Sequence, residues 1–247
     1  MKRALFNWSG GKDSSFALHR VLQDGNYEIA GLLTSFNKAN KRVSMHGIHQ
    51  KLVEEQARQI GLPLYPLMLP QDLGMDKYNA YMEQKLLSYK KNGINVGVFG
   101  DIFLEDLKNY REKQLKSIGM EAHFPLWKKS TAELSQKFID DGFKAIVVSV
   151  SGEKLDKSFV GRIYDESFIG ALPIGVDPCG ENGEFHTFVF DGPIFKDAVP
   201  FTIGETIKRS YELPNDDDSH CFQDDAAPPD ECIYWFMDLQ VPEKKTH

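Results

Sequence analysis

The sequence predicts an α/β fold in which a doubly wound, mainly parallel, Rossmann-like sheet precedes a second, smaller α+β domain. Over the first 125 residues, short apolar runs alternate with segments of helical periodicity, which is typical of βαβ units in a parallel sheet. Two of these runs end in glycine-containing turns. After Pro125-Leu126-Trp127 the regular alternation stops. We therefore expect one domain at 1–125 and a second at 126–247.

In the first domain, five strands are expected, each an apolar run bounded by turn residues. The strands are predicted at 4–8, 27–36, 64–69, 96–99 and 120–123, and the helices at 14–23, 48–60, 78–89 and 104–118. Pro63 and Pro66 indicate that the third strand is an edge or irregular strand. Because ligands bind outside the carboxyl ends of the strands in such sheets, the turns at 9–13 and 100–102 should lie on one rim.

The second domain is expected to mix helices and strands. Helices are predicted at 131–141 and near 160–168, strands at 145–150, 185–190 and 233–241, and a glycine-rich stretch at 175–183. Residues 214–231 hold seven acidic side chains and no Lys or Arg. Since long structureless connections are uncommon inside a core, this segment is predicted to be a solvated loop.

The bulk composition is that of a cytoplasmic globular protein and argues against several other classes. The 247 residues carry a formal charge of −7, whereas proteins that bind DNA or RNA phosphates usually present a basic face. The longest strongly apolar run, 145–150, is far too short to span a membrane. Three cysteines without a CxxC pair argue against structural zinc and a disulfide framework. We therefore expect no DNA and no membrane among the partners.

The first motif is Ser9-Gly10-Gly11-Lys12-Asp13-Ser14, between a strand and a helix. The two glycines let the backbone approach an anion, and the N–H groups and positive dipole end of the helix point to the same place. Lys12 adds positive charge, and Asp13 is suited to cap the helix or to hold Mg²⁺. A turn without a ligand would need only the glycines, so the whole motif favours a phosphate site. It matches neither the Walker pattern nor GxGxxG.

The second motif is Gly100-Asp101-Ile102, directly after the fourth strand. Asp101 is either a turn residue or a ligand for Mg²⁺ or a substrate amine. Arg111 falls on the apolar stripe of the following helix, out of pattern. It either extends along the surface into water or reaches the same rim to neutralise a phosphate or carboxylate.

The third motif, 180–187, reads Gly-Glu-Asn-Gly-Glu-Phe-His-Thr. At strand spacing Glu184 and His186 would share a face, where they would form an acid/base pair. Glu181 would add a metal or amine contact, and Asn182 and Thr187 would complete a substrate-binding set. The alternative is a polar hairpin that precedes a buried strand.

Together with P-L-W at 125–127, these motifs resemble the diphthine–ammonia ligase family, a branch of the N-type ATP pyrophosphatases with a PP-loop; the similarity runs over about residues 1–210. The resemblance implies that ATP and Mg²⁺ are used to adenylate a carboxylate acceptor, with pyrophosphate release, before ammonia attacks to form an amide. It implies that Thr34 borders the adenosine and that Asp13 and Asp101 hold the metal. The implied catalytic residues are Lys12, Asp13, Asp101, Glu184 and His186, and the implied nucleotide-binding residues are Ser9, Gly10, Gly11, Lys12, Asp13, Ser14, Thr34, Gly100 and Arg111.

Other functions stay open at this point. The E-N-G-E-F-H-T form resembles a bacterial branch proposed to act in corrinoid (cobalamin) salvage, because members tied to diphthamide more often carry Glu where His186 stands. An ATP-binding sensor without turnover is an alternative of another class. A sulfur-transfer tRNA enzyme would usually need paired cysteines, and Cys179 has no obvious partner. The expected partners are a small-molecule or protein-borne carboxylate and ammonium, with a homodimer as the assembly considered.

Overall fold

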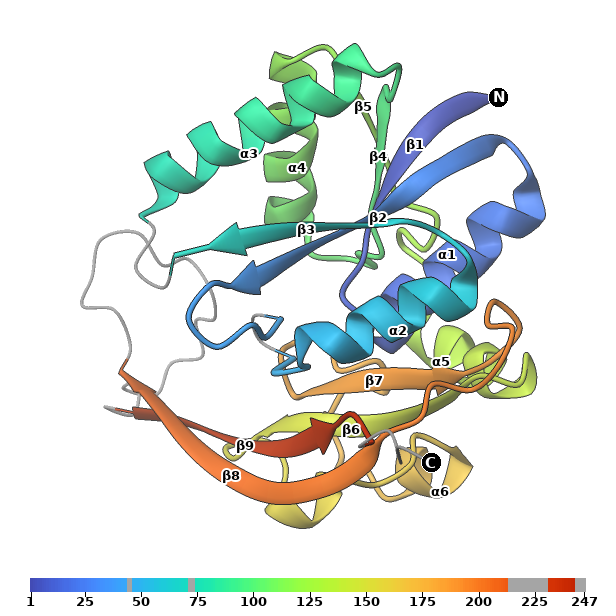
Figure 1. Cartoon of the computed structure of the whole chain (residues 1–247). Coiled ribbons are helices and arrows are strands. Elements are labelled where there is room, and N and C mark those ends of the chain that lie inside the picture. Colours follow the sequence, from blue (N-terminus) through green and yellow to red (C-terminus); the bar gives the residue numbers. More distant parts are fainter. Residues whose placement is uncertain (44–45, 71–73, 213–230, 243–247) are drawn as a thin grey trace, which may run out of the picture.

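The computed structural model describes residues 1–43, 46–70, 74–212 and 231–242, and its main feature is a five-stranded parallel sheet (Figure 1). The strands are β1 (Lys2–Asn7), β2 (Tyr27–Asn37), β3 (Leu64–Leu69), β4 (Val96–Val98) and β5 (Glu121–His123). They lie in the order β3-β2-β1-β4-β5, and every neighbouring pair is parallel. The predicted parallel α/β sheet is confirmed, and β3 lies at an edge, where a proline is tolerated.

Helices cover both faces of this sheet. They are α1 (Lys12–Asp24), α2 (Gln50–Ile60), α3 (Met75–Lys91) and α4 (Glu105–Ser117). Figure 1 shows α3 and α4 on one face and α1 and α2 on the other. Within β1, Leu5 belongs to the apolar cluster of Met82 and Leu115, whereas Phe6 belongs to the cluster of Leu18. Both faces of β1 are therefore buried, which explains its continuous apolar sequence.

A second, antiparallel sheet lies beyond α1 and α2, so that these two helices run between the sheets (Figure 1). Its strands are β6 (Lys144–Ser151), β7 (Phe185–Asp191), β8 (Thr202–Glu212) and β9 (Glu231–Gln240), in the order β7-β6-β9-β8. The accompanying helices are α5 (Thr131–Asp140), α6 (Glu166–Gly170) and a short 3₁₀ helix at Lys157–Phe159. One apolar cluster joins Leu18 and Leu52 of the helices to Val147 and Phe188 of the second sheet. The edge strand β7 is thereby held against α1.

The structure of the second half differs from the prediction in two places. No helix runs through 160–168: Gly161 has φ +82°, Ile163 bridges to Ile146, and Asp165 caps α6 by accepting from the Phe168 N–H. The strand β8 was not predicted. Polar residues occur on both faces of β8, and Ile203 is 58% exposed. The strand therefore lacks the alternation of apolar and polar residues that marks a half-buried strand. Of the acidic segment 214–231, residues 214–230 lie outside the described residues.

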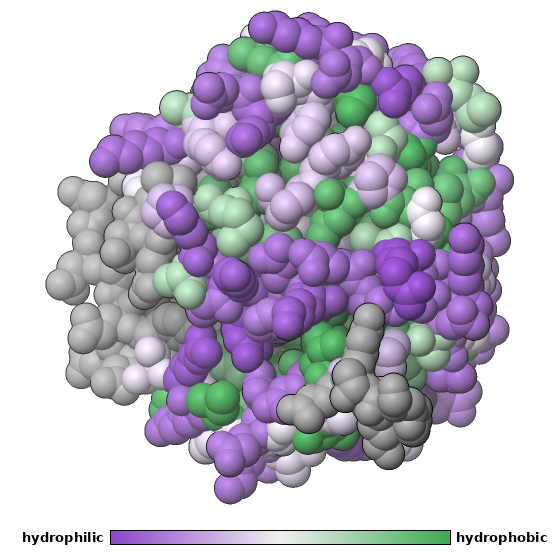
Figure 2. All heavy atoms as spheres, in the orientation of Figure 1, coloured by the Kyte–Doolittle hydropathy of each residue, from purple (hydrophilic) through white to green (hydrophobic). Residues whose placement is uncertain are grey.

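The outer side of α2 is polar. Figure 2 shows a hydrophilic band across the face that bears this helix, and Lys51, Glu54 and Arg58 are exposed there. The opposite side of α2 buries Leu52 and Val53, as an amphipathic helix does between solvent and core. Among the described residues, no helix has the length and apolar character that crossing a membrane requires.

Candidate active site

The loop between β1 and α1 builds the first part of the site. Gly10 has φ +82°, and Gly11 is the N-cap of α1 without a side-chain cap. The Gly11 carbonyl accepts the Ser15 N–H at 3.0 Å and the Ser14 hydroxyl at 2.9 Å. The N–H groups of residues 11–14 have no intrahelical partners, as at any helix start. They concentrate positive potential at the carboxyl end of β1, which suits an anion.

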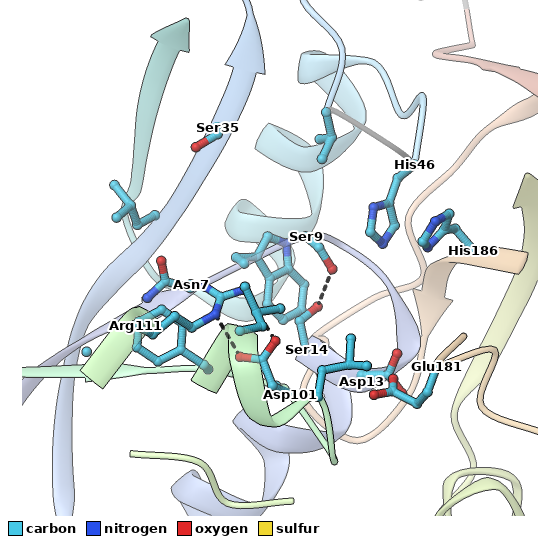
Figure 3. Close-up of a pocket in the computed structure, with 18 of the residues that line it drawn as sticks. Asn7, Ser9, Asp13, Ser14, Ser35, His46, Asp101, Arg111, Glu181 and His186 are labelled. Carbon is cyan, nitrogen blue, oxygen red and sulfur yellow. Dashed lines mark hydrogen bonds and ion pairs between the residues drawn. The ribbon is translucent and has the colours of Figure 1, made fainter. Parts of the chain in front are cut away.

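A cavity of about 570 Å³ opens over this rim (Figure 3), within the usual size range of small-molecule sites. One part is polar, with Ser9, Asp13, Ser14, Asp101, His46, Glu181, His186 and Thr187 among its lining residues. The other part is apolar and reaches between the sheet and α3 and α4, with Leu5, Leu33, Met82, Leu86, Phe99 and Leu115 in its lining. The cavity therefore offers a polar end beside an apolar end.

Lys12 and Asp13 form a close ion pair at the start of α1. Lys12 is only 5% exposed, and its Nζ lies 2.7 Å from each carboxylate oxygen of Asp13. Burial is the largest single influence and acts to lower the pKa of Lys12, but Asp13, Cys179, Tyr164 and Glu181 together outweigh it, and the pKa lies above its ordinary value. Burial also raises the pKa of Asp13, against the opposing effect of Lys12. The lysine is thus a fixed cation beside the loop.

Glu181 points into the cavity next to Asp13, as Figure 3 shows. Burial, together with repulsion by the Asp13 carboxylate, raises the pKa of Glu181 to about 8. A carboxyl group in this position holds its proton up to mildly alkaline pH. Above that pH its ionised form can accept a proton from a donor of similar pKa.

Asp101 and Arg111 meet on the other side of the loop. Arg111 Nε lies 2.9 Å from Asp101 Oδ2, and its guanidinium lies 4.4 Å from the centre of the Phe99 ring. Arg111 therefore reaches the rim instead of extending into water. Burial raises the pKa of Asp101, although Arg111 acts to lower it. At Gly100 an added Cβ would lie 3.0 Å from the Ser14 nitrogen, so only glycine lets this turn approach α1 so closely.

The strand β7 brings the third motif to the same loop. Thr187 Oγ1 accepts the Lys12 N–H at 3.0 Å, over a separation of 175 residues. The His186 ring lies 4.5 Å from that of His46, centre to centre, and both line the cavity (Figure 3). Burial lowers the pKa of His186 well below its ordinary value, and electrostatic repulsion by His46 and Lys12 acts in the same direction. His186 is therefore a neutral imidazole at neutral pH.

Five predicted site residues do not line the cavity: Gly10, Gly11, Thr34, Asn182 and Glu184. Glu184 is 2% exposed and accepts N–H bonds from Asp177 at 3.0 Å and Asn182 at 2.9 Å. The Asn182 side chain also donates to Glu184, at 3.1 Å. Thr34 is buried and donates its hydroxyl to the Trp8 carbonyl at 2.7 Å, while its neighbours Leu33 and Ser35 line the cavity. The structure thus brings Glu181, His186 and Thr187 to the loop but keeps Glu184 and Asn182 in the turn that carries them.

Sequence reasoning missed several residues at this site. His46 and Tyr234 line the cavity from segments that carry no motif. Gln56 of α2 is fully buried and donates to the Gly10 carbonyl at 3.0 Å. A signal for Gln56 was present, because a glutamine between Leu52, Val53 and Ala57 on the apolar face of α2 is as much out of pattern as Arg111 is on its helix.

The parallel sheet with this loop at the carboxyl end of β1 defines a PP-loop, Rossmann-like α/β protein. Residues 1–122 match the family model for the diphthamide synthase N-terminal domain, and residues 130–212 match that for the diphthamide synthase C-terminal domain. The chain therefore belongs to the diphthamide synthase family, and the resemblance stated from its motifs is confirmed.

Curated relatives cover most of the chain. The diphthine–ammonia ligase of Bos taurus is 26% identical over 232 residues, which is 83% of this chain and 84% of that protein. The enzyme of that name from Homo sapiens is 25% identical over the same shares. The one from Danio rerio is 27% identical over 82% of this chain and 87% of its own length. The similarity thus spans both sheets.

Proposed function

We propose that this protein is an ATP-dependent ligase that adenylates a carboxylate, releases pyrophosphate and forms an amide with ammonia. The observation that carries the proposal is the shared cavity: the amino end of α1, the carboxyl groups of Asp13 and Glu181 and the imidazole of His186 all face it. Membership of a family whose relatives are named diphthine–ammonia ligases supports the same reaction class. Diphthine is accordingly the acceptor proposed first.

In this proposal the loop holds the triphosphate. The helix N–H groups and the cation of Lys12 stabilise the negative charge that develops on the departing pyrophosphate. Ser9, whose hydroxyl lies 3.1 Å from that of Ser14, donates to a phosphate oxygen, and the Ser14 hydroxyl would leave the Gly11 carbonyl to do the same. The apolar end of the cavity beside Leu33 and Ser35 is suited to the adenine base. Arg111, held by Asp101, neutralises further phosphate charge.

The donor set fits Mg²⁺. Among the described residues no three His, Cys, Asp or Glu side chains form a metal cluster. Mg²⁺ usually binds through one or two carboxylates together with substrate phosphates. Asp13 and Asp101, which both line the cavity and both have a raised pKa, are the proposed protein ligands, and each lies beside a basic side chain, Lys12 or Arg111. The cation would neutralise phosphate charge during the transfer.

The reaction has two substitution steps, and each forms one bond and breaks another. A carboxylate oxygen of the acceptor bonds to the α-phosphorus of ATP while the bond to the bridging oxygen breaks and pyrophosphate leaves. The nitrogen of ammonia then bonds to the acyl carbon, and AMP leaves with the electron pair of the former acyl–oxygen bond. Ammonium must lose a proton before it attacks. We assign this proton to Glu181. The nitrogen loses a second proton as the amide forms, and that proton passes to solvent.

The cysteines favour this reading over sulfur transfer. Burial raises the pKa of Cys179 to about 12, and its Sγ donates to the Thr131 carbonyl at 3.3 Å. A thiol in this state is a poor nucleophile. Corrinoid salvage and a sensor without turnover have no support in the names of the relatives, which are all ligases.

The test combines the protein with ATP, Mg²⁺, isotopically labelled ammonium and a protein that bears diphthine. We expect stoichiometric AMP and an acceptor in which the carboxyl hydroxyl is replaced by labelled nitrogen, as read by mass spectrometry. Omission of either the acceptor or ammonium should prevent amide formation. Labelled amide in a corrinoid acid but none in the diphthine protein would move the proposal to the second acceptor. ATP cleavage that needs no acceptor at all would refute it.

A further inference from the structure

A fully buried glutamine touches the back of the phosphate loop. Gln56 of α2 is 0% exposed, and its Nε2 donates to the Gly10 carbonyl at 3.0 Å and to the Val189 carbonyl at 2.6 Å. Its Oε1 accepts the Trp8 Nε1–H at 3.0 Å. Three of the four hydrogen bonds that a primary amide can make are thus formed. They join Trp8, which directly follows β1, to the loop and to β7 at a single side chain.

These bonds fix the direction of one peptide plane. The Gly10 carbonyl also accepts the Val189 N–H at 2.9 Å, so it is held toward α2 and β7. A peptide is planar and trans, and the N–H of Gly11 therefore points away from that carbonyl. This N–H donates to Ser9 Oγ at 3.3 Å, and Ser9 lines the cavity. Because both groups belong to one rigid peptide, the bonds that hold the Gly10 carbonyl also fix the direction of the Gly11 N–H.

The left-handed conformation of Gly10, with φ +82°, completes the arrangement. An added Cβ at this position would lie 2.7 Å from Gln56 Oε1, so the buried glutamine leaves no room for a side chain at residue 10. The same side chain makes the loop dependent on the second sheet, because Val189 contributes both its N–H and its carbonyl to the cluster.

We propose that Gln56 is a positioning residue that sets the anion-binding conformation of the phosphate loop and couples it to β7. The identity of the anion as ATP rests on the proposed function. The orientation of the loop does not, because it follows from the hydrogen bonds alone. Gln56 itself lies behind the loop and does not line the cavity.

A matched control lies three residues further along α2. Gln59 is also buried, at 5% exposure, and also ties α2 to the second half of the chain, since its Oε1 accepts the Asp197 N–H at 3.1 Å. Its Nε2 donates to Glu55 at 3.0 Å and makes no contact with the loop. Gln56→Met and Gln59→Met each remove an amide of similar size and leave a backbone group without its partner.

The experiment compares the two variants in the full chain by amide hydrogen exchange over residues 10–14 without nucleotide, by binding of a fluorescent ATP analogue, and by thermal unfolding. We expect both variants to lower Tm. Gln56→Met should speed exchange in the loop and weaken ATP binding about tenfold, whereas Gln59→Met should leave both near the wild-type values. If Gln56→Met does not fold, Gln56→Glu serves instead, because it keeps an oxygen for Trp8 but loses the N–H donors to Gly10 and Val189. This variant should show the same increase in the exchange rate of the loop amides.

Equal loop exchange in Gln56→Met and Gln59→Met would overturn the inference, because it would reduce Gln56 to a structural contact. A wild-type chain that binds no ATP while Gln56→Met still loosens the loop would instead refute the proposed function and leave the positioning role intact.

Discussion

Asp13→Ala is expected to slow pyrophosphate release by a factor of about 1,000 and to destabilise the fold by about 3 kcal/mol. The stability loss follows from the burial of Lys12, whose Nζ has both carboxylate oxygens of Asp13 at 2.7 Å. Removal of one member of such a pair leaves a buried charge without compensation. The rate loss follows from the proposed cation contact at the carboxylate. Single-turnover pyrophosphate release and urea unfolding measure the two effects.

Two further variants separate these effects. Lys12→Met combined with Asp13→Ala removes the whole pair and should recover much of the stability, since neither charge stays buried. It should not recover the rate. Asp24→Ala, at the exposed end of the same helix, should change neither quantity. A stable Asp13→Ala variant with a rate within threefold of wild type would contradict both the ion pair and the metal role.

Glu181→Gln is expected to lower amide formation by a factor of about 100, the lower range for loss of a general base. In the wild type the rate should rise with pH and level off above about 8, because burial and the Asp13 carboxylate raise the pKa of Glu181 to about 8 and only the ionised form accepts a proton. The glutamine variant should lose this rise. Glu166→Gln, an exposed carboxyl group on α6, is the control. An unchanged pH profile in Glu181→Gln would remove Glu181 from the reaction.

The same shift has a consequence for stability without ligands. The pKa of Glu181 in the folded chain lies above its ordinary value of 4.5, so the folded state holds a proton that the unfolded state releases. Its contribution to stability is fully present below about pH 4.5 and is lost as pH rises through about 8. In Glu181→Gln the free energy of unfolding should fall less between these limits.

The sequence predicted the features that are local. The S-G-G-K-D-S loop, the turn at Gly100 and the out-of-pattern Arg111 follow from strand ends and helical spacing. Each of these features lies within a single βαβ unit, either β1-α1-β2 or β4-α4-β5, where turn chemistry and periodicity decide the outcome. The Rossmann-like sheet was predictable for the same reason.

The contribution of the second sheet was not predictable. Thr187 caps a helix that begins 175 residues earlier, and no local signal in either segment announces that contact. Strand spacing also misassigned Glu184, because Gly183 has φ +79° and β7 begins only at Phe185. Glu184 therefore belongs to the turn, where it accepts the N–H groups of that turn. Period-2 reasoning fails where the strand has not yet started.

Taken together, these contacts suggest that both halves of the chain build one site. The loop lies between α2 and β7, with Gln56 and Thr187 on either side of it. We propose that this loop binds ATP and that the chain directs cleavage between the α- and β-phosphates.

Phosphorus NMR of the products tests that claim most directly, in a reaction with ATP, Mg²⁺, ammonium and the diphthine-bearing acceptor. The account predicts AMP and pyrophosphate in equal amounts, with neither formed by the Asp13→Ala variant at a comparable rate. ADP and inorganic phosphate as the products of the wild-type chain would contradict it.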